Sequence, residues 1–199
     1  MPVFVDDMTF ASKSEAAIDK TIKELSQHFK LRDLGPTTQL LGIKIDRDWS
    51  KHSITISQHQ YCLDILEPFG MADCKPISTP MQPNTRLTRS QSPQTPEEAQ
   101  FMKSVPYLAA VGALMYLATT TRPDIAYTVG YLARFNSNPG LAHWQAVKHL
   151  LSYLKGTANY GITYAPNPHS SELFSTFSDV DYGGCKDTGH STGGYIRKT

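Results

Sequence analysis

The chain opens on Val3-Phe4-Val5-Asp6-Asp7, an apolar run followed at once by two carboxylates. The apolar residues predict a short buried strand at residues 3–5. Two adjacent charges at the end of a buried strand are costly unless a partner neutralises them. The alternative is a polar hairpin turn, a position that aspartate favours. Because this strand starts without a preceding cap, turn or partner, we expect the chain to be a piece of something longer.

Length and composition restrict the possible folds and functions only loosely. The chain has 199 residues, of which 40% are hydrophobic and 19% charged, as in an ordinary soluble protein of one medium or two small domains. The net charge of +1 gives no overall basic excess, so any nucleic-acid contact must come from local patches. Three widely separated cysteines indicate reduced thiols of an intracellular protein. No membrane-spanning run or signal peptide is visible.

Local patterns predict alternating helical and strand segments in the first third of the chain. The capping-box spacing at residues 12–15 opens a helix whose apolar face carries Ile18, Ile22, Leu25 and Phe29. Further on, the patterns predict a hairpin of strands 40–45 and 53–57, and then a helix at 58–69 that Gly70 ends.

The rest of the chain divides into a linker, helices and strands. Residues 75–104 are rich in Pro, Ser, Thr and Gln and predict a mobile or surface-draped linker, since proline disfavours regular structure. Three helices are expected after it, at 107–118, 123–135 and 141–155. The last of these has an apolar stripe of Leu141, Trp144, Val147, Leu151 and Leu154. Strands are expected at 160–164, 173–178 and 193–196.

A series of motifs, in order along nearly the whole chain, resembles the Ty1/copia-type retrotransposon Pol polyproteins. Phe4-Val5-Asp6-Asp7 resembles the Tyr-Val-Asp-Asp box of their reverse transcriptases, with Phe4 in place of tyrosine. The stretches that continue the series lie at 31–36, 41–43, 56–61, 74–81, 111–117, 121–127, 143–148 and 153–157. Four residues alone would be a weak signal, whereas the ordered series is specific.

The resemblance implies an α+β fold in three parts. Residues 1–57 would be the C-terminal part of the polymerase palm, and residues 58–157 the helical thumb and connection, including the linker at 75–104. Residues 158–199 would begin an RNase H-like sheet. In the family, aspartates at a hairpin tip hold catalytic Mg²⁺, for which Mn²⁺ can substitute, so Asp6 and Asp7 are the implied metal ligands.

A second acidic motif lies near the end of the chain. Asp179 and Asp181 alternate on a predicted strand and so face the same side, which suits a magnesium site, although solvated acids on an edge strand are the alternative. The segment resembles the opening of the copia-type RNase H domain, in which Asp179 matches the first catalytic aspartate. That site needs further acidic residues from later elements, so the resemblance implies an incomplete site.

The implied partners are an RNA or DNA template–primer and the remainder of the polyprotein, with no membrane. The resemblance places the helix at 107–118 along the template–primer minor groove, where Gly112 would allow close approach. Small residues serve helix–helix packing equally well. Lys148 and Lys155 are further candidates for nucleic-acid contact. We expect no polymerase activity from the isolated chain, and a virus-like particle or the nucleus is the implied location. The alternatives are a non-enzymatic nucleic-acid-binding remnant and a decayed reading frame without function.

Overall fold

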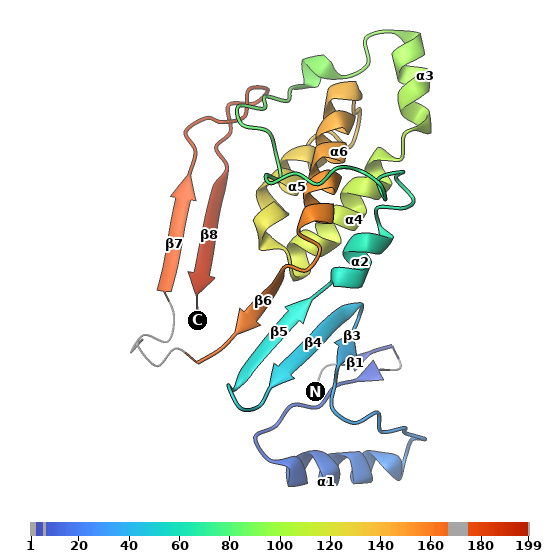
Figure 1. Ribbon diagram of the computed structural model, residues 1–199, viewed down its shortest axis with the longest axis vertical. Coiled ribbons are helices and arrows are strands. Elements are labelled where there is room, and N and C mark those ends of the chain that lie inside the picture. The colour runs from blue at the N-terminus through green and yellow to red at the C-terminus, as the bar shows by residue number, and fades with distance from the viewer. Residues whose placement is uncertain (1–2, 6, 167–174, 199) are drawn as a thin grey trace. The chain divides into compact units, whose positions relative to one another are not determined.

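The computed structural model describes residues 3–5, 7–166 and 175–198, and these form an α+β protein (Figure 1). The mixed helix and strand content confirms the predicted fold class. The chain divides into two compact units, residues 1–40 and residues 41–199, and each is described by itself.

The first unit contains a small hairpin and one helix. Its elements are β1 (Val3–Phe4), β2 (Asp7–Met8), α1 (Glu15–Ser26) and β3 (Gln39–Leu40). Strands β1 and β2 pair antiparallel. The prediction of a buried strand at residues 3–5 is wrong, because Val3 is 58% and Val5 81% exposed. A two-strand ribbon this short has no second layer to bury its side chains.

Helix α1 begins later and ends earlier than its sequence pattern indicated. Its N-cap is Ser14, whose hydroxyl accepts a backbone N–H from the first turn, so the helix does not begin at Ser12. The predicted apolar face is half-buried at Ile18, Ile22 and Leu25. Phe29 lies beyond the helix end and is 61% exposed, so it is not part of that face.

An antiparallel sheet in the second unit joins segments that lie far apart in the chain. Strands β4 (Ile43–Asp48) and β5 (Ser53–Ser57) form the predicted hairpin. Strand β6 (Gly161–Tyr164) pairs with β5 along its whole length. The Thr55 and Thr163 hydroxyls meet across this pair at 2.8 Å. The predicted strand at 160–164 therefore exists, and its partner is the β4–β5 hairpin.

The helices of the second unit follow the predicted order. Outside residues 75–104 they are α2 (His59–Asp64), α4 (Tyr107–Thr120), the 3-10 turn η2 (Pro123–Ile125), α5 (Ala126–Ala133) and α6 (Leu141–Gly156). Helices α4 and α6 match their predictions closely. Helix α2 is shorter than predicted, because the chain turns beyond Asp64 and reaches Gly70 with φ +65°. The helix predicted at 123–135 begins as a separate 3-10 turn.

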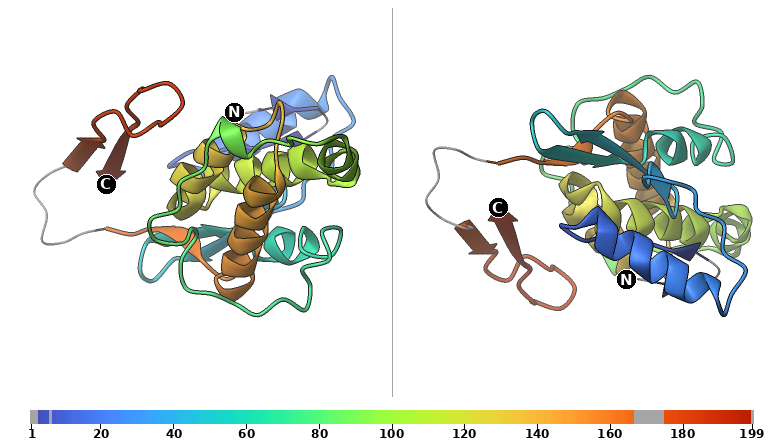
Figure 2. Two further views of the ribbon diagram at one scale, coloured as in Figure 1. Left: turned by 90° about the horizontal axis from the view of Figure 1, so that it is seen from above. Right: turned by 90° about the horizontal axis from the view of Figure 1, so that it is seen from below.

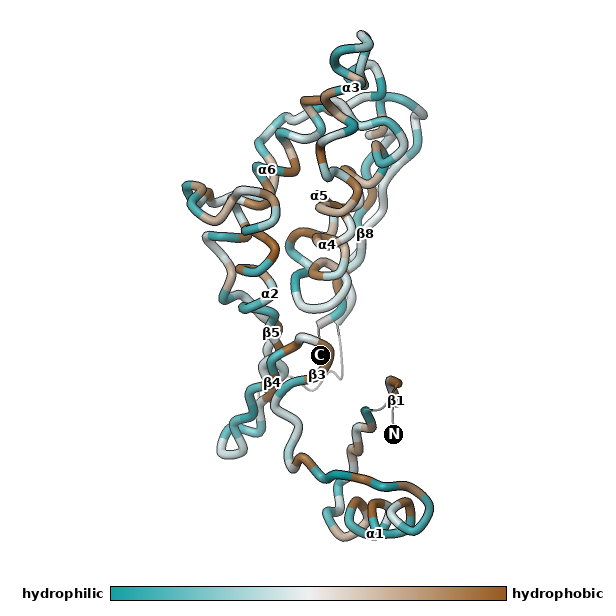
Figure 3. The backbone as a smooth tube through the Cα atoms, turned by 90° about the vertical axis from the view of Figure 1, so that its right-hand side faces the viewer, coloured by the Kyte–Doolittle hydropathy of each residue, from teal (hydrophilic) through white to brown (hydrophobic). Residues whose placement is uncertain are grey.

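The hydrophobic core lies among α2, α4, α5 and α6. Helix α6 crosses α4 in Figure 2, and Figure 3 shows the hydrophobic residues concentrated along these helices. Fully buried members include Leu114, Leu117, Val129, Leu132, Val147, Leu151 and Leu154. The predicted stripe of α6 holds except at Leu141, which is 45% exposed. His143, outside that stripe, is completely buried.

The proline-rich stretch at 75–104 is draped and anchored, and it is not irregular throughout. It contains the 3-10 turn η1 (Arg89–Gln91) and the helix α3 (Pro96–Ser104), in which Pro96 occupies the first turn. Just before η1, the side chain of Leu87 is buried in the hydrophobic core. The Tyr131 hydroxyl accepts the Leu87 N–H at 2.9 Å and donates to the Leu87 carbonyl at 3.0 Å. The region therefore has a fixed attachment point on α5.

Strands β7 (Ser175–Val180) and β8 (Gly193–Lys198) form a separate antiparallel hairpin. The predicted strands at 173–178 and 193–196 agree with it where the structure describes them. Among the described residues no single helix is long and apolar enough to cross a membrane. Only α3 and α4 together, bent by 48°, reach that length and composition.

Candidate nucleic-acid interface

The β1–β2 hairpin presents the first pair of predicted site residues. Phe4 pairs with Asp7, so the hairpin turn that follows β1 includes Val5. Val5 has φ +51°, a left-handed conformation that is rare for a β-branched residue and that suits a two-residue hairpin turn. Asp7 is exposed on β2, whereas Asp6 lies outside the described residues. The role of these two aspartates as metal ligands stays a prediction.

The second predicted carboxylate site lies on the β7–β8 hairpin. Asp179 is exposed and its carboxylate accepts the N–H of Val180 at 2.8 Å. The Asp181 carboxylate accepts the N–H of Thr192, so it is used to hold the loop between the two strands. Within the described ranges no three His, Cys, Asp or Glu side chains lie close enough together to hold a metal ion. The described carboxylates therefore do not make up a complete magnesium site.

The three predicted nucleic-acid contacts lie on two different helices. Gly112 is on the exposed side of α4. Apart from the neighbouring helix backbone, no described atom lies within 4 Å of where its Cβ would be, so this face does not pack closely on another described helix. Lys148 is exposed on α6, with its ammonium 5.7 Å from the centre of the Trp144 ring. Lys155 donates to the backbone carbonyl of Ala72. Gly112 and Lys148 thus remain accessible, whereas Lys155 already has a partner within the chain.

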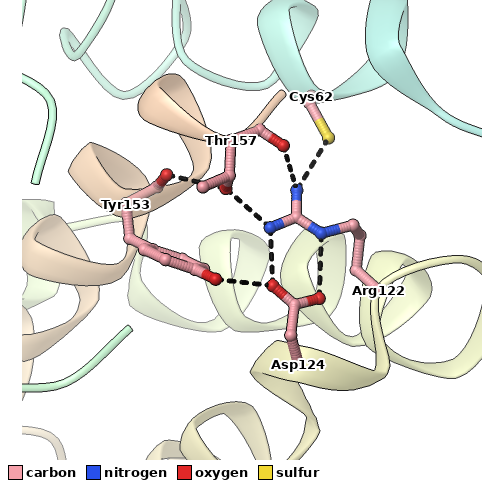
Figure 4. Close-up of polar contacts among 5 residues, drawn as sticks. All are labelled: Cys62, Arg122, Asp124, Tyr153 and Thr157. Atoms are coloured by element: carbon pink, nitrogen blue, oxygen red, sulfur yellow. Dashed lines mark hydrogen bonds and ion pairs between the residues drawn. The ribbon is translucent and has the colours of Figure 1, made fainter. Parts of the chain in front are cut away.

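A buried polar cluster of the second unit surrounds Arg122, which is 1% exposed (Figure 4). Its guanidinium donates to the Thr157 carbonyl at 3.0 Å and to the Thr157 hydroxyl at 2.7 Å. It also forms an ion pair with Asp124, and Tyr153 donates to the same carboxylate. These residues come from η2, from α6 and from the residues that flank both. The cluster therefore ties the start of α5 to the end of α6, where the chain turns toward β6.

Electrostatics explain why this charge can be buried. Burial alone would raise the pKa of Asp124, but the hydrogen bonds and charge of Arg122 outweigh it and hold the pKa below its usual range. Burial likewise raises the pKa of the neighbouring Cys62 thiol, against the opposing charge of Arg122. The cluster is thus an ionised pair beside a neutral thiol. It holds the start of α5 and the end of α6 together.

Comparison with known proteins connects these elements to a family. The family model described as reverse transcriptase (RNA-dependent DNA polymerase) matches residues 1–83. The chain is 40% identical to the retrovirus-related Pol polyprotein from transposon TNT 1-94 of Nicotiana tabacum, over 98% of its own length. It is 36% identical to the Pol polyprotein from transposon RE1 of Arabidopsis thaliana, again over 98% of its length. The chain belongs to the reverse transcriptase family of Ty1/copia-type transposon Pol polyproteins.

The chain is short compared with the polyproteins that it matches. It spans 14% of the TNT 1-94 polyprotein and 13% of the RE1 polyprotein. An uncharacterised mitochondrial protein of Arabidopsis thaliana is closer in size, being 36% identical over 97% of this chain and 75% of its own length. No solved structure matches the chain.

The reverse transcriptase resemblance had been predicted from the motif series, and the comparisons confirm it. The roles of Asp6, Asp7, Asp179, Gly112 and Lys148 are not tested by these comparisons and stay predictions. Sequence reasoning missed the Arg122 cluster as a structural unit. Arg122, Pro123 and Asp124 had been noted only as part of the family series. The local signal for a buried ion pair is the Arg-Pro-Asp sequence itself, in which an arginine and an aspartate lie on either side of a proline.

Proposed function

We propose that the chain is the stretch of a transposon Pol polyprotein that runs from the end of the reverse transcriptase palm to the start of RNase H. The family match over residues 1–83 and the alignment of the polyproteins with 98% of the chain support this proposal. We assign residues 1–57 to the palm and the helices to the thumb and connection. Because β6 pairs with β5, a strand assigned to the palm, we assign Tyr164 to the reverse transcriptase part and begin the RNase H part after it.

For the parent polyprotein we propose RNA-templated DNA synthesis. Asp6 and Asp7 would contribute ligands for Mg²⁺ in the polymerase, and Asp179 in RNase H, and the ion would supply charge neutralisation at the reacting phosphate. The described residues lack a group of three ligands, so the isolated chain is assigned no step that depends on the metal. Its own contribution is to bind the template–primer.

The exposed side of α4 carries the binding role in this proposal. Gly112 leaves open space at the middle of the helix, flanked by the exposed Leu108 and by Tyr116. A surface without a bulky side chain lets a sugar–phosphate strand approach the helix backbone closely. Lys148 on α6 supplies an exposed positive charge for phosphate. With a net charge of only +1, we expect moderate affinity that depends strongly on salt.

Titration of the chain into a fluorescein-labelled RNA–DNA template–primer tests the proposal. We expect anisotropy to report binding that weakens steeply between about 50 and about 200 mM salt. A bulky Gly112→Arg variant would weaken binding if the strand lies on α4 and would strengthen it if only the added charge matters. Lys148→Gln should also weaken binding, and Lys103→Gln, at an exposed lysine on α3, is its control for the loss of one charge. Absence of wild-type binding at the lowest salt would rule the proposal out.

A further inference from the structure

A polar surface pocket has a lining that includes neither Gly112 nor Lys148 nor any residue of the Arg122 cluster. It has a volume of about 230 Å³ and is formed where the turn η1 and its following residues meet the end of α5. Its lining consists of Arg89, Ser92, Pro93, Gln94, Arg134, Phe135, Ser137 and Asn138. Two arginines and no carboxylate line it. Pockets for drug-sized ligands begin at roughly 300 Å³, so this one suits a smaller group such as a phosphodiester.

The two arginines are available to a ligand. No ion pair among the described residues involves Arg89 or Arg134. The Arg89 side chain is exposed and makes no hydrogen bond within the described chain. Arg134 donates one bond to the Thr192 hydroxyl at 2.7 Å, which leaves its other donors free to bind. The carboxylate of Asp187 accepts the backbone N–H of Arg89 and not a guanidinium N–H.

A row of aromatic rings leads along α5 to this pocket. Tyr127 is 55% exposed and lies parallel to Tyr131, with ring centres 6.1 Å apart and planes inclined by 15°. The guanidinium of Arg134 lies over the same Tyr131 ring at 5.2 Å. Tyr127 and Arg134 are seven residues apart, which is about 10 Å along a helix. Exposed aromatic rings beside a positively charged groove are how proteins bind single strands without reading their sequence.

We propose that this pocket binds a phosphodiester group of a nucleic-acid strand, with Arg89 and Arg134 contacting its oxygens. Arginine presents a fork of donors that matches phosphate. The strand then continues along α5, where a base stacks on the exposed ring of Tyr127. This assignment rests on the proposed nucleic-acid binding function, and it adds a second contact, separate from α4 and Lys148.

The test is binding of a labelled single-stranded oligonucleotide by the full 199-residue chain, measured by anisotropy over a range of salt. We expect Arg89→Gln and Arg134→Gln each to weaken binding about fivefold to tenfold and to lower the salt slope by about 0.7. Arg86→Gln is the matched control, since this exposed arginine lies three residues from Arg89 and outside the pocket. It should change affinity less than twofold.

Two further measurements separate the parts of the proposal. Tyr127→Leu should weaken oligonucleotide binding but not the binding of heparin, a polyanion without bases. Inorganic phosphate at the same total phosphate concentration should displace the oligonucleotide poorly, and equal displacement would identify a free-phosphate site and overturn the nucleic-acid assignment. Because the Arg89 side chain makes no hydrogen bond or ion pair within the described chain, its variant should keep the wild-type unfolding midpoint.

The outcomes distinguish this proposal from the function on which it rests. Wild-type binding that neither Arg89→Gln nor Arg134→Gln weakens beyond Arg86→Gln overturns the pocket and leaves the α4 surface in place. Absence of wild-type binding to both single-stranded and template–primer probes overturns both proposals.

Discussion

Arg122 and Asp124 form a two-point ion pair, with Nη2 of the arginine 2.7 Å from Oδ2 and Nε 2.9 Å from Oδ1 of the aspartate. The arginine side chain is 1% exposed and the aspartate side chain 33% exposed. A buried guanidinium is tolerated only when its donors are matched, and here the carboxylate and Thr157 match them. The pair therefore fixes the turn between α4 and α5 against the end of α6.

Replacing Arg122 by methionine should destabilise the chain strongly. The substitution removes the charge that neutralises Asp124 and leaves the Thr157 carbonyl without its donor. Breaking a buried pair by removing one partner costs about 3–5 kcal/mol, and we expect the lower end because Asp124 retains some access to water. Urea unfolding followed by circular dichroism would give the change in free energy.

The exposed pair of Lys44 and Asp46 is the control for Arg122→Met, with side chains 65% and 56% exposed. Lys44→Met should lower the free energy of unfolding by less than about 1 kcal/mol.

The pH dependence of the free energy of unfolding is a second measurement of the Arg122–Asp124 pair. The pKa of Asp124 is lowered in the folded state, so its contribution is present above its unfolded pKa of about 3.9 and is lost as pH falls below that. Equal costs for the two variants would contradict the structural role of the Arg122 cluster.

Most of the structure that could be predicted from the sequence came from the helical periodicity of its apolar residues. The predicted stripe of α6 places Val147, Leu151 and Leu154 in the core, where all three are fully buried. The prediction of the β4–β5 hairpin also rests on a local pattern, since the polar turn and its two flanking strands are consecutive in the sequence. In both cases the signal lies within a few residues of the contact that it predicts. Local sequence is informative there because local geometry decides which face is buried.

Long-range contacts were not predictable in the same way. The pairing of Thr55 with Thr163 spans 108 residues, and nothing in either strand specifies the other. The burial of Arg122 and His143 was missed for a related reason, because each needs partners from distant segments. Of the predicted site, Asp7 lies beside the expected hairpin turn, whereas Asp6 is outside the described residues. The pocket at Arg89 and Arg134 had no local signal at all.

The buried His143 should make stability depend on pH. Its Nδ1 accepts the N–H of Gly140 at 2.8 Å, and its ring stacks on Phe135. Burial lowers its pKa, against smaller opposing effects of the Thr88 carbonyl and Asp187. A base whose folded pKa is lowered stabilises fully above its unfolded pKa, about 6.5, and loses that contribution as pH falls toward the folded value. Urea midpoints should therefore drop between about pH 7.5 and about pH 5.5.

A glutamine at position 143 isolates this effect from the other histidines. Glutamine at the third helical position can still accept a bond from the N-cap N–H, but it does not titrate. His143→Gln should therefore show a smaller drop in urea midpoint over the same pH interval than the wild type. The same drop in both proteins would show that protonation elsewhere is responsible.

Removing the Tyr131 hydroxyl should loosen the segment that it anchors. Tyr131→Phe deletes both hydrogen bonds to Leu87 and leaves a partly buried N–H without its acceptor, at a cost of about 1–3 kcal/mol. We expect limited trypsin digestion to cut faster after the exposed Arg86 in this variant. Tyr127→Phe is the control on the same helix, because its hydroxyl has no partner in the described chain. Cleavage inside α6 before any cut in residues 75–95 would contradict the draped arrangement.

The isolated chain should not extend a primer. Asp7 stands alone among the described residues as a candidate ligand at the β1–β2 hairpin, and two-metal nucleotidyl transfer needs carboxylates that fix two ions about 3.5–4 Å apart. A primer-extension assay with Mg²⁺ or Mn²⁺ gives the measurement, with a variant lacking both Asp6 and Asp7 as the background. Incorporation above that background would show that the chain supplies a complete site.

The isolated chain should also fail to cleave the RNA of an RNA–DNA hybrid. Asp179 lies exposed on β7, whereas the carboxylate of Asp181 accepts the N–H of Thr192, so of these two carboxylates only that of Asp179 is exposed to solvent. Hydrolysis by two ions requires several ligands around both metals, and one carboxylate cannot position them. The assay compares the wild type with Asp179→Asn and with a chain extended through a complete RNase H domain. We expect cleavage only by the extended chain, and only while it keeps Asp179. Cleavage by the short chain that disappears in Asp179→Asn would show that the β7–β8 hairpin carries more of the site than its described carboxylates indicate.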